Sequence, residues 1–235
     1  MSMMLQTTDL CKSFHGQTAV SRICLHIEKN TVYGLLGPNG AGKSTTLKMI
    51  AGILKPIAGS ITFDGHAWTR SDLNHIGALI ETPPLYENLT ARENLKVKAA
   101  LLGLPDSRIT EVLHTVRLAD TGRKRAGQFS LGMKQRLGIA LALLGHPKLL
   151  ILDEPANGLD SVGIEEIRAL IRSFPAKGIT VILSSHMLSE VQQTADHIGI
   201  IAGGVLGYEG KLNANENLEQ LFMDVVKNNR REGMA

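Results

Sequence analysis

Cysteines and long apolar runs are scarce in this chain. Its 235 residues include only Cys11 and Cys24, which have no C-x-x-C spacing, so a disulfide framework is excluded and a reducing compartment is expected. The longest apolar stretch, residues 137–145, is far shorter than the ~18 residues typical of a membrane span. No basic region followed by an apolar core opens the chain, so no signal peptide is expected. We therefore predict a cytoplasmic protein that does not cross a membrane by itself.

The sequence also lacks a strong excess of charge of one sign and clustered histidines. Its 25 basic and 22 acidic residues give a net charge of +3, which is too balanced to indicate nucleic acid as a partner. The eight histidines form no H-E-x-x-H or similar pair, which argues against a zinc site. At 43% hydrophobic and 20% charged residues, the chain is predicted to fold into one domain, with or without a subdomain.

What the sequence does contain is a complete phosphate-binding pattern, G-x-x-x-x-G-K-[ST]. A buried strand is expected before it and a helix over 43–51, which is the context that the pattern requires. Glycines let the backbone curl around phosphate oxygens, the positive helix end faces the anion, and Lys43 adds a mobile charge. Ser44 is placed to give a hydroxyl oxygen to Mg²⁺. The pattern comprises Gly37, Pro38, Asn39, Gly40, Ala41, Gly42, Lys43, Ser44 and Thr45.

Strands and helices are predicted to alternate around this motif. Antiparallel strands are expected over 5–10 and 18–27, and a mainly helical block over 82–145. After that block we expect strands at 148–154, 179–186, 197–205 and 207–212, and helices at 163–174 and 216–228.

This order predicts an α/β fold, in which a phosphate-loop NTPase core with a mostly parallel sheet carries an N-terminal antiparallel β portion and an inserted helical subdomain. The core is expected over 1–81 and 146–215, the helical subdomain over 82–145, and a C-terminal helix with a tail over 216–235. All 235 residues are thus predicted to form a single nucleotide-binding domain.

Two carboxylates end the predicted strand 148–154. Asp153 is expected on the phosphate side of the sheet, where it can hold Mg²⁺ through water. Glu154 is suited to polarise a water molecule for attack on a γ-phosphoryl group. An acidic turn at the surface is the alternative, but the phosphate loop upstream favours the catalytic interpretation.

With these motifs in this order, the sequence resembles the ATP-binding cassette (ABC) family. Residues 129–136 are similar to the family signature: Ser130 and Gly132 match its Ser and second Gly, whereas Leu131 and Met133 depart from its commonest form. The resemblance implies that Ser130 and Gly132 face a γ-phosphate held by an opposite subunit. An ordinary capped helix would explain Ser130 but not Gly132, which costs a helix about 1 kcal/mol relative to Ala.

Three further residues match family positions. Asp160 corresponds to the acid of a loop that contacts the other subunit, and His186 to a switch histidine that contacts the γ-phosphate. Phe14 stands at the position of the aromatic that stacks on adenine. A plain core role is the alternative for Phe14, and a structural role for His186.

Glu81 stands where the family normally has Gln, a residue that touches Mg²⁺ at the join with the helical subdomain. Glu still offers a hard oxygen ligand. This variant resembles bacterial exporters that protect cells from lantibiotic and bacitracin-like peptides. A single drifted residue is the alternative explanation.

The resemblance implies an ATPase subunit that binds ATP and Mg²⁺ and powers a separate integral-membrane permease. It would work as a head-to-tail dimer, expected to be a homodimer, on the inner face of the cell membrane and without nucleic acid. Glu154, His186 and Lys43 would carry catalysis. A soluble cassette ATPase acting on nucleic acid or ribosomes is the alternative, although the coiled-coil insertion of repair members and the second cassette of translation members are absent. A third possibility, a phosphate-loop kinase, would not need His186 or residues 129–136.

Overall fold

A six-stranded sheet forms the centre of the structure, a computed structural model that describes residues 2–213 and 217–232. Within this described part of the chain, neighbouring strands are parallel except for the last pair, β10 with β11. The predicted mostly parallel sheet is therefore confirmed, and the carboxyl ends of its parallel strands share one edge. In spatial order the strands are β11 (Val205–Lys211), β10 (His197–Ala202), β4 (Val32–Leu36), β9 (Thr180–Ser185), β8 (Leu149–Asp153) and β7 (Ile76–Leu79).

A second, antiparallel sheet contains the N-terminal strands, as predicted. The expected strand 18–27 is divided in the structure: at residues 24 and 25 side chains replace part of the backbone ladder. The Asp9 amide donates to the Cys24 sulfur at 3.3 Å, and the Leu25 amide donates to the Thr7 hydroxyl at 2.9 Å. The strands are β1 (Met3–Phe14), β2 (Gln17–Ile23), β3 (His26–Glu28), β5 (Ala58–Phe63) and β6 (His66–Ala67).

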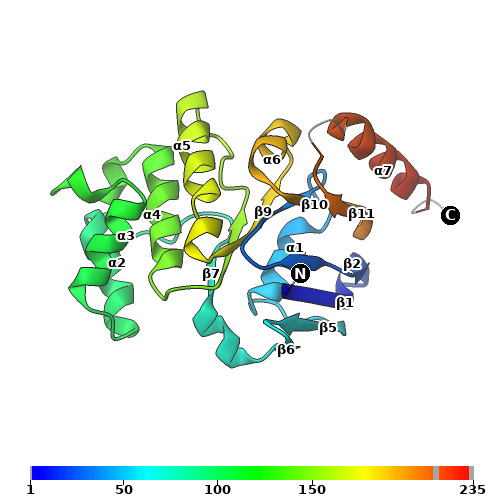
Figure 1. Cartoon of the computed structure of the whole chain (residues 1–235), viewed down its shortest axis with the longest axis horizontal. Coiled ribbons are helices and arrows are strands. Elements are labelled where there is room, and N and C mark those ends of the chain that lie inside the picture. The colour runs from blue at the N-terminus through cyan, green and yellow to red at the C-terminus, as the bar shows by residue number, and fades with distance from the viewer. Residues whose placement is uncertain (1, 214–216, 233–235) are drawn as a thin grey trace.

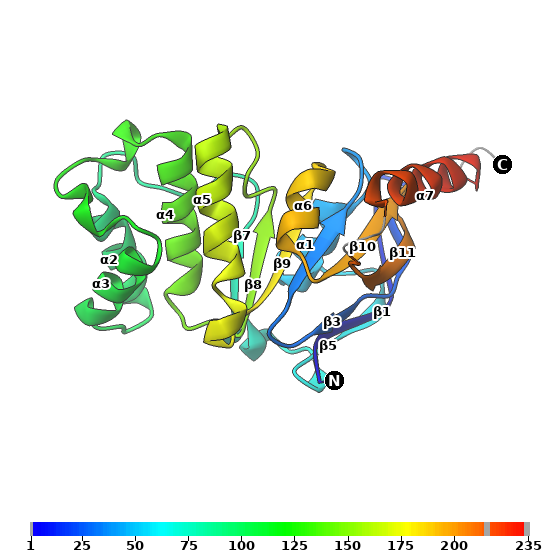
Figure 2. The same ribbon diagram turned by 45° about the horizontal axis from the view of Figure 1, so that its top comes forward.

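Helices cover both faces of the central sheet (Figures 1 and 2). Helix α1 shares a core with the antiparallel sheet, whereas α4, α5 and α6 pack on the opposite face. The helices are α1 (Lys43–Ile50), α2 (Ala91–Leu101), α3 (Asp106–Thr115), α4 (Leu131–Leu143), α5 (Ser161–Arg172), α6 (Leu188–Thr194) and α7 (Leu218–Glu232). Short 3₁₀ turns are η1 (Arg70–His75), η2 (Ala119–Thr121), η3 (Ala126–Gln128) and η4 (Pro175–Lys177).

Helices α2 to α4 lie between β7 and β8 in the sequence and form one end of the molecule in Figure 1. A capping box opens α2, because the Glu93 amide donates to the Thr90 hydroxyl and the Thr90 amide donates to the Glu93 carboxylate. Helix α4 packs against β7, which joins this helical block to the central sheet. The boundaries of a separate helical subdomain, at residues 82 and 145, therefore stay a prediction.

The C-terminal helix α7 packs on the core through buried Leu218, Val225 and Val226. The start predicted for it at residue 216 lies outside the described residues. None of the helices in the described ranges is both long enough and apolar enough to span a membrane.

The alternation of side chains along β8 decides where its carboxylates point. Leu149 and Ile151 pack in the core that contains α1, and Leu150 and Leu152 pack on the other side. Because side chains alternate with a period of two, Asp153 follows the first pair and faces the α1 side of the sheet. The phosphate loop lies on this same side.

Asp64, in the turn between β5 and β6, ties this hairpin to two lysines. Its carboxylate is paired with Lys148 at 2.7 Å and with Lys29. The hydrogen bond from Lys148, and to a smaller extent the one from Lys29, lowers the pKa of Asp64 to about 2. The charged form is therefore favoured in the folded protein, and this stabilisation is present above the ordinary pKa of an aspartate and lost as the pH falls through the lowered value.

Replacing Asp64 by Asn should lower the free energy of unfolding near neutral pH by about 1 kcal/mol. Asn tolerates the left-handed φ of 48° at this position, so the change removes the charge with little backbone strain. Urea unfolding of both proteins over a pH series measures the effect. The difference between them should shrink from about pH 5 downwards, and a difference independent of pH would contradict the assigned cause.

Candidate active site

A hollow of about 350 Å³ lies at the carboxyl edge of the central sheet, and we call it the phosphate hollow. It brings together the phosphate loop and the two residues expected to act on the γ-phosphate, Glu154 and His186. These residues come from the ends of β4, β8 and β9, which the parallel sheet places side by side. Its lining consists of residues 39–45, Ala19, Glu154, Asn157 and His186.

The phosphate loop depends on backbone that only glycine supplies cheaply. Gly40 and Gly42 have φ values of 77° and 106°, and a Cβ on Gly42 would lie 2.6 Å from the Ala19 carbonyl oxygen. Gly42 is also the N-cap of α1 and makes no side-chain cap. The first amides of α1 are thus left to face the hollow, where they form a site for an anion.

Lys43 is buried at the floor of the phosphate hollow, with 5% of its surface exposed. Its Nζ donates to the carbonyl oxygens of Gly37 at 2.7 Å and Pro38 at 3.2 Å. It also lies 3.4 Å from Glu154 Oε1. These partners hold the ammonium group in place beside the loop amides, which suits it to neutralise phosphate charge.

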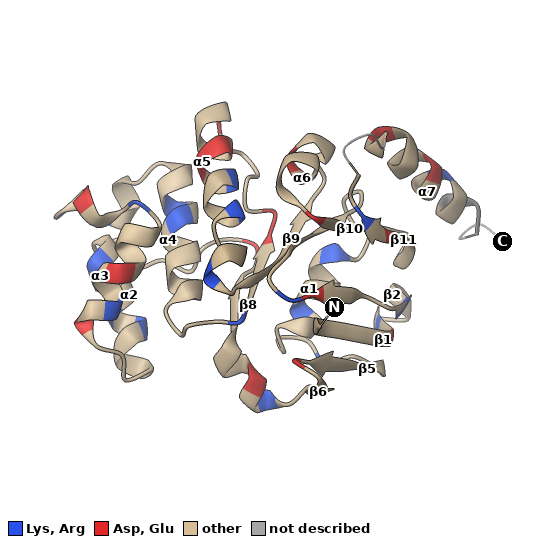
Figure 3. Ribbon diagram, in the orientation of Figure 1, with Lys and Arg blue, Asp and Glu red and all other residues tan. Residues whose placement is uncertain are grey.

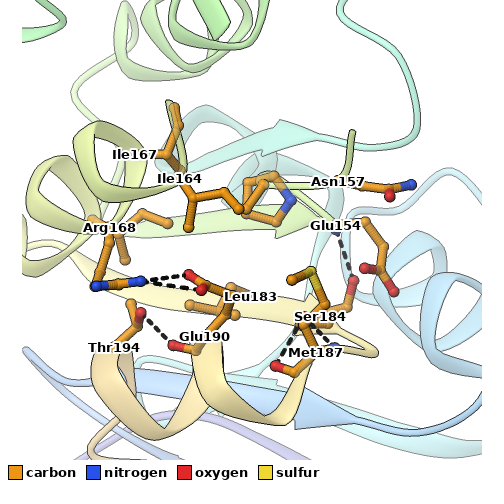
Figure 4. Close-up of a pocket in the computed structure, with 14 residues that line it drawn as sticks. Glu154, Asn157, Ile164, Ile167, Arg168, Leu183, Ser184, Met187, Glu190 and Thr194 are labelled. Carbon is orange, nitrogen blue, oxygen red and sulfur yellow. Dashed lines mark hydrogen bonds and ion pairs between the residues drawn. The ribbon is translucent and has the colours of Figure 1, made fainter. Parts of the chain in front are cut away.

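One hydroxyl, that of Ser184 on β9, contacts both Asp153 and Glu154 at the end of β8: the carboxylate of Asp153 and the backbone amide of Glu154. Ser184 Oγ donates to Asp153 Oδ1 at 2.6 Å. It also accepts from the Glu154 amide at 2.9 Å, and Figure 4 labels both of these residues. Glu154 has a left-handed φ of 52°, which is strained for this residue type and common at functional sites. Its Oε2 lies 2.8 Å from His186 Nδ1. Glu154 therefore contacts both other predicted catalytic residues.

Sequence reasoning missed Ser184, Asn157 and Ala19 as parts of this site. A signal existed for Ser184, because a polar residue at the end of an otherwise apolar buried strand needs a partner. None existed for Ala19, which contributes only backbone and packing from β2.

A second hollow, of about 420 Å³, contains Ser130, Gly132 and Asp160, and we call it the signature hollow. It shares no lining residue with the phosphate hollow. Ser130 Oγ accepts from the Met133 amide at 3.3 Å and so caps α4, as predicted. Asp160 Oδ1 accepts from the Gly163 amide at 2.8 Å and caps α5. Within one chain, these three residues are therefore not brought to the phosphate loop.

Helix α4 contains two glycines, Gly132 and Gly138, and only Gly138 is required by close packing within the chain. A Cβ on Gly138 would lie 2.9 Å from Pro83 and 3.0 Å from Leu79, so packing within the chain explains this glycine. A Cβ on Gly132 would meet nothing nearer than Leu159, at 3.8 Å. Glycine lowers the stability of a helix relative to alanine. No contact among the described residues requires a glycine at position 132.

Phe14 and Glu81 lie outside the lining of both hollows. Phe14 is 41% exposed, so the alternative of a plain core residue does not hold. It ends β1, on the hairpin whose second strand carries Ala19 into the phosphate hollow. Glu81 follows β7 with a left-handed φ of 62°, and its carboxylate is paired with Lys48 of α1 at 2.5 Å.

The protein groups suited to Mg²⁺ are few. The described residues include no cluster of three or more His, Cys, Asp or Glu side chains that could hold a metal. Asp153 is buried and its carboxylate accepts a hydrogen bond from Ser184, while Ser44 lines the hollow. One carboxylate, one hydroxyl and substrate phosphates are a donor set that Mg²⁺ commonly uses, so these residues fit the ion.

A parallel sheet with a glycine-rich loop leading from β4 into α1, and carboxylates on a neighbouring strand, defines a P-loop nucleoside triphosphatase. The sequence profile of the ABC transporter family matches residues 20–157. The chain belongs to this family, and it is therefore an ATP-binding ATPase. The predicted family, fold and nucleotide are confirmed.

Two relatives and one solved structure are similar to this chain over nearly its whole length. The lantibiotic transport ATP-binding protein SrtF of Streptococcus pyogenes is 48% identical over 95% of this chain and 97% of its own. The bacitracin transport ATP-binding protein BcrA of Bacillus licheniformis is 46% identical over 99% of this chain and 74% of its own. The crystal structure of the ADP conformation of MJ1267, an ATP-binding cassette of an ABC transporter, superposes with a TM-score of 0.86 at 25% identity, covering 97% of this chain and 98% of that one.

Proposed function

We propose that this chain powers a separate membrane permease that exports an antimicrobial peptide of the lantibiotic or bacitracin type, or a similar drug, and so gives immunity to it. The observation that carries this proposal is the 48% identity to a lantibiotic transport ATP-binding protein across 95% of the chain. The identity to a bacitracin transport protein and the Glu at position 81 support the same substrate class.

In the proposed mechanism, residues of the phosphate hollow position ATP and its attacking water. Lys43 and the loop amides neutralise the β- and γ-phosphates, and Phe14 stacks on the adenine. Ser44 and Asp153, with Glu81 as a further ligand, would hold Mg²⁺, and the bound ion would supply charge neutralisation. Catalysis is then mainly positioning and electrostatic stabilisation.

Glu154 accepts the proton of the attacking water or orients that water toward the γ-phosphate. Its contacts with Lys43 and His186 support this role, because they place the carboxylate at the edge of the hollow. His186, 37% exposed, faces the same hollow and is proposed to contact the γ-phosphate.

We further propose that two copies of the chain bind head to tail around two ATP molecules. The phosphate hollow of one copy would face Ser130, Gly132 and Asp160 of the other. Two observations support this arrangement: the two hollows are separate within one chain, and no contact among the described residues requires Gly132. The N-terminal amides of α4 that the Ser130 cap leaves free would then face the γ-phosphate.

The permease is proposed to dock near residues 81–91, beside the helical block, which would place the chain on the cytoplasmic face of the membrane. Tyr86, 54% exposed, lies in this segment. No nucleic-acid partner is proposed: basic and acidic residues are interspersed over the helices in Figure 3, whereas binding to nucleic acid needs a basic face.

Co-expression in a sensitive host tests this proposal. The chain and the permease from an adjacent reading frame, together, should lower susceptibility to lantibiotics or bacitracin, and either protein alone should not. ATP turnover that responds only to added DNA or ribosomes, and not to the permease, would instead support the soluble alternative.

Glu81→Gln should leave ATP turnover of the purified chain within about twofold of wild type but weaken protection in the co-expressing host. The substitution keeps an oxygen ligand yet removes the ion pair with Lys48, which links α1 to the join with the helical block. Phosphate release and susceptibility assays measure the two effects. Loss of ATP binding in this variant would show that the charge of Glu81 is needed for nucleotide binding rather than for coupling.

A further inference from the structure

Helix α5 is joined to α6 by an ion pair that the proposed mechanism does not use. Arg168 of α5 donates through one nitrogen to both carboxylate oxygens of Glu190 on α6, at 3.0 and 3.1 Å (Figure 4). A second nitrogen of Arg168 donates to Gln193 at 2.6 Å. Both charged side chains are largely buried, with 23% and 13% exposed. Such a pair holds one geometry better than an exposed ion pair does.

The two helices lead to different hollows. Asp160, which caps the first turn of α5, lies in the signature hollow. His186, two residues before α6, lies in the phosphate hollow. The turn between His186 and α6 is closed by the Met187 amide, which donates to Ser185 Oγ at 2.9 Å. Only Met187 separates His186 from the first residue of α6, so a displacement of α6 would reach the histidine, while this bond ties the same turn to the end of β9.

The space between α5 and α6 is almost filled, so the helices have little freedom to slide independently. A cavity of only about 20 Å³ remains, lined by residues of both helices and by the segment 154–157 that joins Glu154 to the signature side. Ile164, Ile167 and Leu183 form apolar walls of this space in Figure 4. Close packing transmits displacement, whereas loose packing absorbs it.

We propose that Arg168 and Glu190 are positioning residues that couple α5 to the His186 segment, so that a partner subunit engaging the signature side sets the position of His186 in the same chain. This inference rests on the proposed two-chain ATP site. The Arg168–Glu190 pair supplies the fixed connection, and the packed interface supplies the stiffness. Turnover in one phosphate hollow would then depend on engagement of the signature hollow of the same chain.

Two single variants and a reversed pair test this coupling in the full chain. Arg168→Met and Glu190→Gln should each lower kcat for ATP by about tenfold while changing KM less than twofold, because His186 rather than the phosphate loop is displaced. The Hill coefficient for ATP should fall toward one. The double variant Arg168→Glu with Glu190→Arg should recover a substantial part of both. Two variants are used so that a folding failure of one leaves the other informative.

Arg172→Met is the matched control. Arg172 lies one turn further along α5 and contacts the Thr194 carbonyl at 3.1 Å and Asp196 at 3.5 Å, nearer the far end of α6. Its kcat and Hill coefficient should stay within about twofold of wild type. The melting temperature of each variant separates a stability effect from a positioning effect, since loss of stability alone would not change the Hill coefficient of the folded protein.

Kinetics of the wild-type protein distinguish a failure of the α5–α6 coupling from a failure of the proposed two-chain ATP site. If wild-type turnover shows neither cooperativity in ATP nor dependence on protein concentration, the proposed two-chain site is wrong, and the coupling falls with it. If wild type is cooperative and Arg168→Met and Glu190→Gln keep its kcat and Hill coefficient, only the coupling is overturned. Failure of the reversed pair to recover activity, with the fold intact, also overturns it.

Discussion

Lys43→Ala should lower ATP turnover at least about 10³-fold and abolish measurable ATP binding at micromolar protein. The ammonium group donates to the Gly37 and Pro38 carbonyls of the loop, and the hollow that contains it is also lined by Glu154. Without Lys43, the phosphates would face that carboxylate with one compensating charge fewer. The variant should keep the fold, because both hydrogen bonds of the Lys43 side chain are to its own loop and its distant partner is the Glu154 carboxylate alone.

Phosphate release and isothermal titration calorimetry with ATP measure this prediction. Lys96→Ala is a suitable control, because Lys96 is an exposed lysine of α2, and its loss should change neither quantity. Circular dichroism and thermal unfolding check the fold of both variants. Turnover by Lys43→Ala comparable to that of wild type would mean that the nucleotide does not use the phosphate hollow.

Glu154→Gln should reduce turnover about 10³-fold while ATP binding persists. The amide keeps the size of the side chain, and the Glu154 backbone still donates to Ser184 Oγ. What is lost is a carboxylate that can accept a proton and that pairs with Lys43 and His186. Removing this negative charge also reduces repulsion of the γ-phosphate. The ATP-bound state should therefore accumulate.

Accumulation of that state should appear as a dimer. Analytical ultracentrifugation with ATP should show two chains per particle for Glu154→Gln, and one chain when ATP is replaced by ADP. Glu165→Gln, which changes a carboxylate of α5 outside both hollows, should leave turnover and oligomeric state as in wild type. Full turnover by Glu154→Gln would remove Glu154 from catalysis, whereas an ATP-bound monomer would contradict the composite site.

Local patterns predicted the elements that hold the nucleotide well. The strand, loop and helix around residues 37–45, the carboxylates that end β8, and the cap at Ser130 all depend on interactions within a few residues. No local pattern indicates β3 as a separate element, because the break at residues 24 and 25 depends on Thr7 and Asp9, far away in the sequence.

Long-range pairing decided the rest of the site. Ser184 bridges Asp153 and Glu154 only because β8 and β9 lie side by side in register, with Asp153 opposite Ser184. Lys48 meets Glu81 because α1 packs near the end of β7, and no spacing in the sequence indicates that pair. The exposure of Phe14 likewise follows from its place at the tip of a hairpin rather than from its residue type.

The sequence by itself determined that this protein binds a nucleoside triphosphate, since a contiguous loop and helix end supply the phosphate site without help from distant residues. Its motif order also predicted the ABC family. Only the tertiary structure decided that Lys43, Glu154 and His186 meet in one hollow while Ser130, Gly132 and Asp160 gather in another. The physical reason is that parallel strands bring their carboxyl ends together, whereas the N-terminal ends of α4 and α5 meet elsewhere through helix packing.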